Sequence, residues 1–491
     1  MPKRVAIIGS GFSGLSAACY LAKNGFDVSI YEKNKNVGGR ANILKEEGYT
    51  FDMGPSWYWM PDVFEHFFND FGFKVNDFYE LERLDPGYRV FFSEDDYIDL
   101  SASLDKIKEL FESLEKGSSK KLDLFLRDAK EKYDISFNDF INLPNHSALE
   151  LIKAKNIKHL KHLDISKSVS SLVHKYFKNE KIINLLEFPV LFLGAKATKI
   201  PALYTLMNYA DFNLGTWYPK GGMYNVVLGF EKLSKELGVK IKTNSNVSNI
   251  ECDNGKATGI KIGNTIIEVD YVIGSADYHH IESQLLSIKH RNYSESYWNK
   301  RVLAPSSILF YIGVNKKLPK LEHHNLIFDE DFELHSNEIY DSKKWPTKPR
   351  MYISMASKTD ASSAPSNSEA IVGLIPVAVG LDDTNDIRKK YKDLFIDKLE
   401  SISGEKIRDN IEYIKTYAHS EFVEDYNSFK GNAYGLANTL KQTAFLKPKI
   451  RNKKLKNLYY CGQLTVPGPG VPPSIISGKI IANEIIKDVK K

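Results

Sequence analysis

The sequence predicts an α/β protein whose main unit is a Rossmann-like domain assembled from both ends of the chain. Near the N-terminus, a buried-strand pattern from Val5 to Ile8 runs into a glycine-rich turn and an alanine-rich helix. Near the C-terminus, residues 458–463 form another short strand pattern, followed by a proline- and glycine-rich turn and a helical pattern. The 491 residues allow two or three compact domains, so we expect an α+β unit inserted between these ends.

The N-terminal turn has the spacing of a phosphate-binding loop. Its residues are Gly9, Ser10, Gly11, Phe12, Ser13 and Gly14. Gly9 permits the tight turn, Gly11 lets the backbone approach a pyrophosphate, and Gly14 allows close packing of helix and strand. The helix that follows, from Leu15 to Lys23, offers free amide donors to phosphate at its N-terminus.

An acidic residue follows the second strand at the position expected for a ribose contact. The strand Val28 to Tyr31 ends at Glu32, with Lys33 next in the chain. A carboxylate about 20 residues after the glycine loop can accept hydrogen bonds from ribose hydroxyls. Its presence favours a ribose without a 2′-phosphate, but it does not distinguish FAD from NAD.

Two short glycine motifs favour FAD. Gly38-Gly39-Arg40 closely follows Glu32, and Gly54-Pro55-Ser56 comes after a hairpin-like stretch. Together with the glycine loop, these motifs resemble the extended signature of the glutathione-reductase-like flavoproteins of the amine oxidase and desaturase type. The resemblance implies an FAD cofactor whose pyrophosphate is reached by Arg40. A permanently charged, bidentate donor suits phosphate oxygens.

The C-terminal motif resembles the second flavin motif of the carotenoid desaturases. Gly462 and Gln463 end the strand, and the turn 467–473 contains Gly470, Val471 and Pro472. A helix is predicted from Ser474 to about Val489, and its N-terminus would stabilise negative charge on a reduced flavin.

The middle of the chain predicts a third contribution to the cofactor site. Strand patterns at 239–242, 247, 259–262 and 266–268 indicate a small β-meander, and 271–277 returns as another strand. The resemblance implies backbone contacts to adenosine near Val247, Ala276 and Asp277.

Further blocks extend the resemblance from residue 4 to about residue 483. These blocks are Trp217-Tyr218-Pro219-Lys220-Gly221-Gly222-Met223, Thr198–Leu203 and Gly431–Leu436. They resemble the bacterial phytoene desaturases most closely. The implied architecture is a glutathione-reductase-type FAD-binding domain formed by 1–95, 217–300 and 415–491. Segments 96–216 and 301–414 would form a partly helical substrate-binding domain that could associate with a membrane.

The resemblance implies a carotenoid desaturase acting on a long apolar carotenoid. Hydride would leave an allylic carbon for FAD and a proton would leave the neighbouring carbon, with quinone or oxygen as the final electron acceptor. Phytoene is the favoured substrate. The open alternatives are desaturation of a thirty-carbon homologue of phytoene, 3,4-desaturation of γ-carotene or a hydroxycarotenoid, carotenoid isomerisation on the same scaffold, an amine oxidase, and a carotenoid carrier without turnover.

The sequence does not identify a catalytic residue or predict a metal site. Asp211 and Glu187 are candidate proton acceptors. In an extended segment, the adjacent residues of His279-His280 and His323-His324 would point to opposite sides, so we expect no joint chelation.

Composition favours a cytoplasmic protein at a membrane surface. The net charge of +5 gives no support for nucleic-acid binding, and three scattered cysteines indicate a reducing compartment. The sequence has no uninterrupted apolar run of about 18 residues, so we expect no membrane-spanning helix. The lysine- and histidine-rich segment 153–181 also contains apolar residues, a pattern typical of a solvated helix or of a helix lying at lipid headgroups. With the resemblance, it leads us to expect peripheral membrane association.

Overall fold

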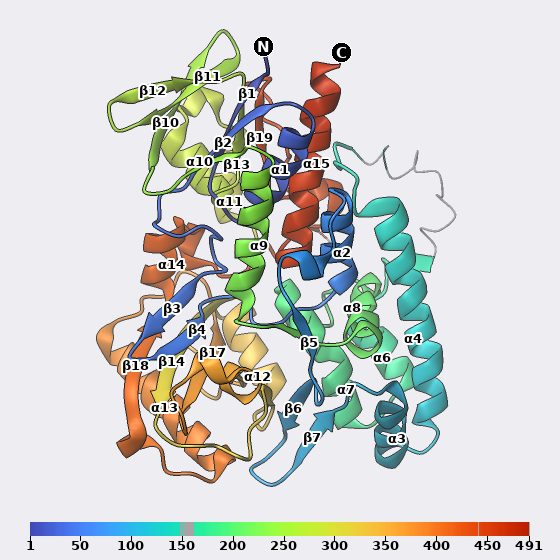
Figure 1. Cartoon of the computed structure of the whole chain (residues 1–491). Helices are drawn as coiled ribbons and strands as arrows, with labels where there is room; N and C mark the ends of the chain where they lie inside the picture. The colour runs from blue at the N-terminus through green and yellow to red at the C-terminus, as the bar shows by residue number, and fades with distance from the viewer. Residues whose placement is uncertain (148–149, 151–161, 440, 491) are drawn as a thin grey trace.

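The computed structural model describes residues 1–147, 150, 162–439 and 441–490. A parallel sheet occupies the end of the molecule where both termini lie (Figure 1). Its strand order is β19 (Leu458–Tyr460), β13 (Tyr271–Gly274), β1 (Arg4–Ile8), β2 (Asp27–Tyr31) and β9 (Lys240–Lys242). All four pairings are parallel. Three distant parts of the chain therefore build one Rossmann-like sheet, and the predicted α/β fold class is confirmed.

Helices from both ends and from the middle of the sequence cover this sheet. They are α1 (Phe12–Lys23), α2 (Pro61–Asn69), α9 (Met223–Glu236), α10 (Tyr278–Leu285) and α15 (Val471–Val489). Helix α15 starts three residues earlier than predicted. Leu15 and Leu21 of α1 and Ile475 and Ile481 of α15 are buried in one apolar core. The hydrophobic effect thereby fixes the C-terminal helix against the N-terminal one.

The predicted meander forms, but without its first strand. β10 (Val247–Asp253), β11 (Lys256–Ile262) and β12 (Thr265–Glu268) make a three-stranded antiparallel sheet. The segment 240–242, expected in that meander, instead pairs with β2 in the parallel sheet as strand β9. Helix α9 lies directly before β9 and acts as the crossover that a parallel pairing requires.

A larger mixed sheet forms the opposite half of the molecule. Its order is β18 (Ile411–Tyr417), β14 (Ser306–Val314), β17 (Glu369–Val377), β16 (Met351–Ser354), β15 (His324–Ile327), β6 (Tyr88–Phe91) and β7 (Tyr97–Leu100). Helix α13 (Asn385–Ser403) packs on one face, where a Cβ on Gly373 would lie 2.1 Å from the Phe395 ring. Strand β6 falls inside the segment 1–95 that we assigned to the cofactor domain, yet it pairs with β15. The division into two domains stays a proposal.

Most of the remaining helices pack beside this sheet, and two antiparallel strand pairs connect the halves. The helices are α3 (Leu104–Leu114), α4 (Ser118–Ile135), α6 (Val169–Tyr176), α7 (Glu180–Glu187), α8 (Leu206–Tyr209), α11 (Glu295–Asn299), α12 (Phe332–Ser336) and α14 (His419–Tyr426). The pairs are β3 (Ile43–Glu46) with β4 (Tyr49–Asp52), and β5 (Leu81–Arg83) with β8 (Trp217–Pro219). The first pair is a hairpin, whereas the second joins distant parts of the chain.

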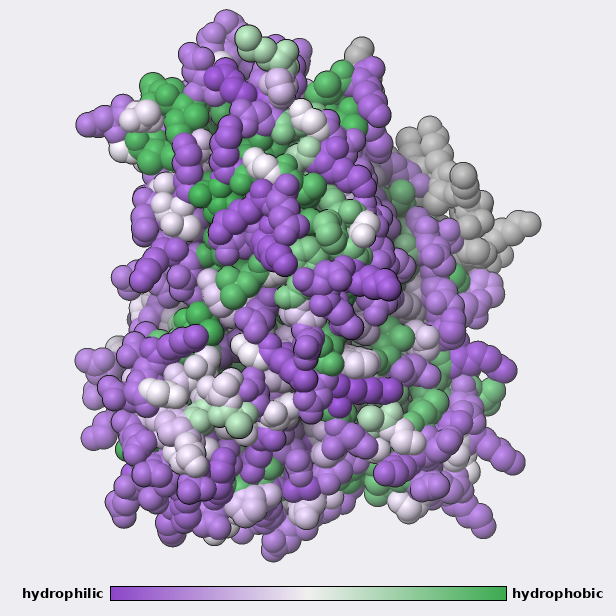
Figure 2. Space-filling view, viewed as in Figure 1, coloured by the Kyte–Doolittle hydropathy of each residue, from purple (hydrophilic) through white to green (hydrophobic). Residues whose placement is uncertain are grey.

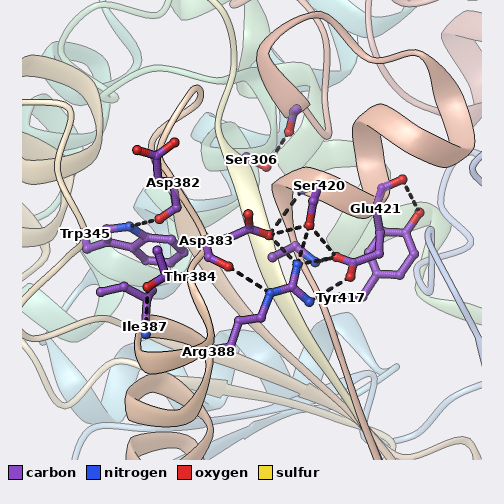
Figure 3. Close-up of polar contacts among 12 residues, drawn as sticks. Ser306, Trp345, Asp382, Asp383, Thr384, Ile387, Arg388, Tyr417, Ser420 and Glu421 are labelled. Carbon is purple, nitrogen blue, oxygen red and sulfur yellow. Dashed lines mark hydrogen bonds and ion pairs between the residues drawn. The ribbon is translucent and has the colours of Figure 1, made fainter.

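Arg388 joins α13 to the start of α14 (Figure 3). Its Nη1 and Nη2 atoms each donate to the Glu421 carboxylate at 2.7 Å, and Nη2 also donates to Asp383. Glu421 in turn accepts from the backbone amide of Ala418 at 2.7 Å, one turn before it. A bidentate guanidinium–carboxylate pair has a fixed geometry, so it sets where α14 begins.

Only the end of the basic segment 153–181 lies within the described residues. There, four apolar side chains that we considered for a membrane-facing surface are buried: Leu163, Leu172, Val173 and Phe177. Ile165 is the exposed one, at 38%. This part of the segment therefore packs inward as an ordinary amphipathic helix with a solvated face.

On the face drawn in Figure 2, polar side chains predominate and apolar ones lie in several groups between them. Within the described residues, no helix combines the length and apolar character needed to cross a membrane.

Candidate cofactor and substrate site

One cavity of about 630 Å³ joins the two halves of the molecule. All of the cofactor-site residues predicted from the sequence line it except Gly14. They are Gly9, Gly11, Phe12, Ser13, Glu32, Lys33, Gly38, Gly39, Arg40, Gly54, Pro55, Ser56, Val247, Ala276, Asp277, Gly462, Gln463, Gly470, Val471 and Pro472. Segments separated by more than 400 residues in sequence thus meet around one space.

The glycine loop fits tightly against the sheet and opens toward the cavity. Gly9 has φ +101°, and a Cβ there would lie 3.0 Å from the Ala276 amide nitrogen. A Cβ on Gly14 would lie 2.4 Å from the Gly9 carbonyl oxygen, which explains why Gly14 packs and does not line the cavity. A Cβ on Gly11 would meet nothing within 4 Å, and α1 begins there without a side-chain cap. The first amides of α1 are thus available to an anion.

Glu32 holds the glycine loop in place. Its Oε2 atom accepts from the Ser10 amide at 2.9 Å and from the Ser10 hydroxyl at 2.7 Å. Its Oε1 atom accepts from the Asn34 amide at 2.9 Å. These bonds leave the carboxylate at the cavity wall, where its remaining lone pairs can face a ribose hydroxyl.

Arg40 crosses the cavity wall toward the C-terminal part of the chain. Its Nη2 atom donates to the Ser428 hydroxyl at 3.1 Å and to the Asn432 carbonyl at 3.2 Å. With its amide oxygen facing the guanidinium, Gln463 accepts from both terminal nitrogens at 3.0 Å. The Nε atom of Arg40 is buried and has no partner among the described residues. Removal from water lowers the pKa of Arg40, and the carboxylate of Asp277 opposes that shift.

Asp277 fixes the start of α10 beside this guanidinium. Its carboxylate accepts from the His280 amide at 3.3 Å and from the Phe429 amide at 3.2 Å. Burial raises the pKa of Asp277, while the positive charge of Arg40 lowers it. The two groups therefore support each other's charged forms.

The start of α15 presents few backbone donors. Gly470 caps the helix without a side-chain bond, and Pro472 and Pro473 have no N–H group, which leaves the Val471 amide at the tip. Behind this turn, the Asn438 Oδ1 and Lys447 Nζ atoms are buried and have no partner among the described residues. A Cβ on Gly468 would lie 3.1 Å and 3.5 Å from these two atoms. Burial lowers the pKa of Lys447 to about 7.

These features fit FAD. The wall supplies uncapped amides and a guanidinium for a pyrophosphate, and an acidic residue for a ribose. Its unpartnered buried atoms suit a ligand with both donors and acceptors, because an unsatisfied buried polar atom costs about 1–3 kcal/mol.

Beyond Ser56, the cavity becomes apolar. Its wall there is formed by aliphatic and aromatic side chains from the mixed sheet and the short helices, including Trp57, Phe137, Phe188, Leu203, Leu326, Phe328, Ile339, Met351 and Leu374. Two ionisable residues also line this part. Arg350 donates to the Glu330 carbonyl and lies over the Phe328 ring, and both ring nitrogens of His335 are hydrogen-bonded within the protein.

Neither predicted proton-acceptor candidate lines the cavity among the described residues. Asp211 is buried, and its carboxylate accepts from the Tyr88 hydroxyl at 2.7 Å. Burial raises the pKa of Asp211 to about 7 and also raises that of Glu187. The sequence gives the spacing of Asp211 before the Trp217–Met223 block, but not the side of the chain toward which it points.

The histidine pairs differ in their local structure from our expectation. His279 and His280 lie in helix α10, not in an extended segment, and His279 contacts Glu295 at 2.9 Å. His323 and His324 bond separately to Thr359 and Tyr352, each at 2.7 Å. In the described part of the chain, no three His, Cys, Asp or Glu side chains are grouped to hold a metal.

Sequence reasoning missed two residues that line the apolar part of the cavity. Tyr352 lies in strand β16, and Arg350 directly precedes that strand. Neither belongs to a motif, and only the alternation of strand β16 could have placed Tyr352 on one sheet face.

Comparisons with known proteins agree with this site. Residues 12–486 match the family described as flavin containing amine oxidoreductase. The chain is 39% identical over 490 residues to a carotenoid 3,4-desaturase from Haloarcula japonica, covering 99% of this chain and 98% of the relative. It is 31% identical to a 4,4′-diapophytoene desaturase from Staphylococcus haemolyticus, with 99% of both chains covered.

The fold also matches a solved structure. The crystal structure of an oxidoreductase from Methanosarcina mazei aligns with a TM-score of 0.63 at 16% identity, over 99% of this chain and 100% of the other. This likeness supports the fold, and the two sequence relatives support the family. The chain therefore belongs to the flavin-containing amine oxidoreductases and, within them, to the carotenoid desaturases, as an FAD-dependent oxidoreductase.

Proposed function

We propose that this enzyme introduces conjugated double bonds into a long carotenoid by passing hydride from the substrate to FAD. The observation that carries the proposal is the single cavity, which runs from the glycine loop of α1 to an apolar lobe between the mixed sheet and the short helices. A flavin and a hydrocarbon can meet there without leaving the protein interior.

Different site residues would bind different parts of the cofactor. The Gly9–Gly14 loop and Arg40 would receive the pyrophosphate, and Glu32 the ribose. The segments near Val247 and Ala276 would contact adenosine, and Gly54–Ser56 would face the flavin opposite Gly462 and the start of α15. Bound in this cradle, FAD supplies the hydride acceptor.

The apolar lobe would bind the substrate by burial. A carotene offers no polar atom to a protein, so affinity comes from apolar surface removed from water, about 25 cal/mol per Å² before the costs of binding. The aromatic and aliphatic wall also excludes water from the positive charge that develops as hydride leaves carbon. Alignment of the polyene is the remaining contribution of the chain.

Two substrates fit this proposal. The sequence motifs favoured phytoene, whereas the higher identity to the carotenoid 3,4-desaturase favours terminal 3,4-desaturation of a more extended carotene such as γ-carotene. Isomerisation on the same scaffold would leave the hydrogen count of the product unchanged.

The test is a visible spectrum of FAD-loaded protein incubated under air with phytoene in liposomes, beside a γ-carotene sample. New long-wavelength bands from phytoene support phytoene desaturation, and a red shift confined to γ-carotene supports 3,4-desaturation. Mass spectrometry of the product counts the hydrogens lost. Unchanged mass and spectrum for both substrates, with FAD still bound, contradict the proposal.

The substrate also suggests where the enzyme works. We propose that it acts at the membrane surface from the cytoplasmic side, since carotenoids dissolve in lipid, and that a quinone or oxygen reoxidises the flavin. Co-sedimentation with anionic vesicles at low salt, and release at high salt, would support surface binding.

A further inference from the structure

A buried chain of hydrogen bonds leads away from the cavity wall. The Ser56 and Tyr352 hydroxyls, which both line the cavity, lie 2.8 Å apart. The Tyr352 hydroxyl lies 2.7 Å from the Nδ1 atom of His324. His324 is fully buried, stacks on Trp57 with ring centroids 4.2 Å apart, and has no partner for its Nε2 atom among the described residues.

The mixed sheet brings these groups together. His324 of β15 pairs with Ser354 of β16, and Leu326 pairs with Tyr352. Because side chains alternate along a strand, His324, Tyr352 and Ser354 share one sheet face, with His324 diagonal to Tyr352. The loop after β4 adds Ser56 to the same point.

The partners of Tyr352 set the direction of its proton. The Ser56 hydroxyl lies 2.8 Å from the phenol oxygen, and either of the two can be the donor. When Ser56 donates, the phenol proton is directed to His324 Nδ1, and the ring carries its own proton on Nε2.

Other bases at the cavity wall are unsuited to take a proton in the apolar part. The acidic residues among its described lining residues, Glu32, Asp277 and Asp425, belong to the cofactor end. His335 donates from Nε2 to the Pro376 carbonyl at 2.9 Å, and its Nδ1 accepts from the Arg350 amide at 3.1 Å. Both ring nitrogens of His335 are therefore already hydrogen-bonded, and neither is free to accept a proton from the substrate. Burial lowers the pKa of Arg350 to about 10. Because that value is still well above neutral pH, Arg350 is a cation there and cannot accept a proton.

We propose that Tyr352 and His324 act together as the proton acceptor of the desaturation, with Ser56 positioning the phenol. This inference rests on the proposed function. As the hydride leaves one carbon for the flavin, the neighbouring C–H bond breaks and its electron pair becomes the new C=C bond. The released proton goes to the Tyr352 oxygen, whose own proton moves to His324 Nδ1. The substrate would thus lose two hydrogens, one as hydride, for which bound FAD would supply the two-electron acceptor, and the other as a proton, which His324 would carry as imidazolium.

Ser354, the strand partner of His324, lines a second cavity through which that proton would leave. This cavity is water-sized, about 10 Å³, and Ser56 lines both it and the larger cavity. Asp52, Tyr218 and His323 also line it. Burial lowers the pKa of His324 well below its usual value, so the imidazolium returns its proton readily. Burial raises the pKa of Asp52 to about 6, which suits a transient acceptor beside that cavity.

The test compares Tyr352→Phe and His324→Gln with wild type, using whichever of phytoene or γ-carotene the wild-type holoenzyme desaturates. Anaerobic flavin bleaching at saturating substrate is followed by stopped flow. Each variant is expected to slow bleaching by about 10²-fold or more, with normal FAD content and carotenoid affinity. In His324→Gln, the introduced amide oxygen accepts the phenol hydrogen bond but cannot take up a proton, so this variant separates proton acceptance from positioning.

A second readout does not depend on turnover. Nitrogen NMR of ¹⁵N-histidine holoenzyme, assigned by loss of one signal in His324→Gln, should show a neutral ring with the proton on Nε2. The matched control is Tyr391→Phe, a buried tyrosine of α13 whose hydroxyl donates to the Pro346 carbonyl away from the cavity. It should bleach at the wild-type rate.

Three results overturn the inference. Wild-type bleaching rates in Tyr352→Phe or His324→Gln would do so while leaving the proposed function intact. A proton on His324 Nδ1 would leave no lone pair there for the phenol. A wild-type enzyme that leaves every carotenoid unchanged would remove the proposed function, and the relay with it.

Discussion

At the scale of single residues, the cavity is bordered by polar atoms whose bonds within the protein are incomplete. Arg40 and Asn438 line the cavity, and Lys447 and His324 lie behind its wall; Arg40 Nε, Asn438 Oδ1, Lys447 Nζ and His324 Nε2 are all buried without a partner among the described residues. Such atoms are rare in native folds because each costs free energy. Their concentration around one space indicates that ligands complete the site.

Arg40 gives the first prediction. Arg40→Met removes the guanidinium from the cavity wall, and the dissociation constant for FAD should rise about 10- to 100-fold, because bonds to a charged donor contribute about 1.5–3 kcal/mol. Arg40→Lys keeps the charge but loses the bidentate geometry of the guanidinium. Its dissociation constant for FAD should therefore lie between those of wild type and Arg40→Met. Fluorescence titration of the FAD-stripped protein measures both, and an unchanged dissociation constant for Arg40→Met would contradict the assignment.

Asp211 gives a stability prediction. Its pKa is raised to about 7 in the folded protein, whereas an unfolded chain titrates near the usual 3.8. The folded state then holds more protons between these values, so stability falls as pH rises from about 4 to about 7. Asp211→Asn removes this dependence and should stabilise the protein at pH 8 by on the order of 2–4 kcal/mol relative to its effect at pH 4.

Urea unfolding of wild type and Asp211→Asn at pH 4 and pH 8 measures the effect. Equal pH dependence in the two proteins would show that the carboxyl is ionised in the fold. Because Asp211 does not line the cavity, carotenoid turnover should persist in the variant.

At the scale of elements, the contact between α1 and α15 couples the two ends of the chain. A Cβ on Gly478 of α15 would lie 2.4 Å from the Ser13 carbonyl oxygen and 2.7 Å from the Ala17 amide nitrogen of α1. Backbone atoms of a helix cannot move aside independently. The approach of α15 therefore depends on the absence of a side chain at this point.

Gly478→Ala should lower the free energy of unfolding by about 1–3 kcal/mol through overpacking. Gly11→Ala is the matched control, because its Cβ would meet nothing within 4 Å and its φ of −67° suits any residue. That variant should unfold like wild type without cofactor but bind FAD poorly, since the methyl group projects into the cavity. Denaturant unfolding with FAD titration distinguishes the two effects, and equal stabilities would show that α15 can shift.

At the scale of the whole molecule, the cavity wall links the parallel sheet, the mixed sheet and the short helices. A ligand that binds such a wall stabilises the folded state by mass action, by about 2.7 kcal/mol at 100 times its dissociation constant. FAD should therefore raise the thermal midpoint of stripped protein in a concentration-dependent way. The rise should be smaller in Arg40→Met at the same FAD concentration. Differential scanning calorimetry measures both, and a midpoint insensitive to FAD would show that the folded protein does not bind the cofactor.

The cofactor half of the site could be predicted from sequence because its chemistry is local. The Gly9–Gly14 loop, Glu32 and Arg40 follow strand and helix patterns within one βαβ stretch, where spacing fixes geometry. The C-terminal motif could also be predicted from sequence, since Gly470 and the prolines after it mark a helix start. The structure places nearly all of these residues on one cavity wall.

The substrate half could not be predicted in this way. Asp211 and Glu187 were plausible as isolated carboxylates, yet neither lines the cavity. Tyr352 and His324 meet only because β15 and β16 pair in one register, which a single sequence does not specify. Likewise, strand β9 pairs with β2 in the parallel sheet, whereas we expected it in the meander.

The sequence by itself thus determined the fold class, the FAD cofactor and the family, because short motifs encode backbone turns and helix ends. The tertiary structure decided which side chains converge on the apolar part of the cavity, because convergence depends on the pairing and burial of distant segments. Local spacing sets the direction of a backbone over a few residues, while the environment of a side chain is set by everything that packs against it.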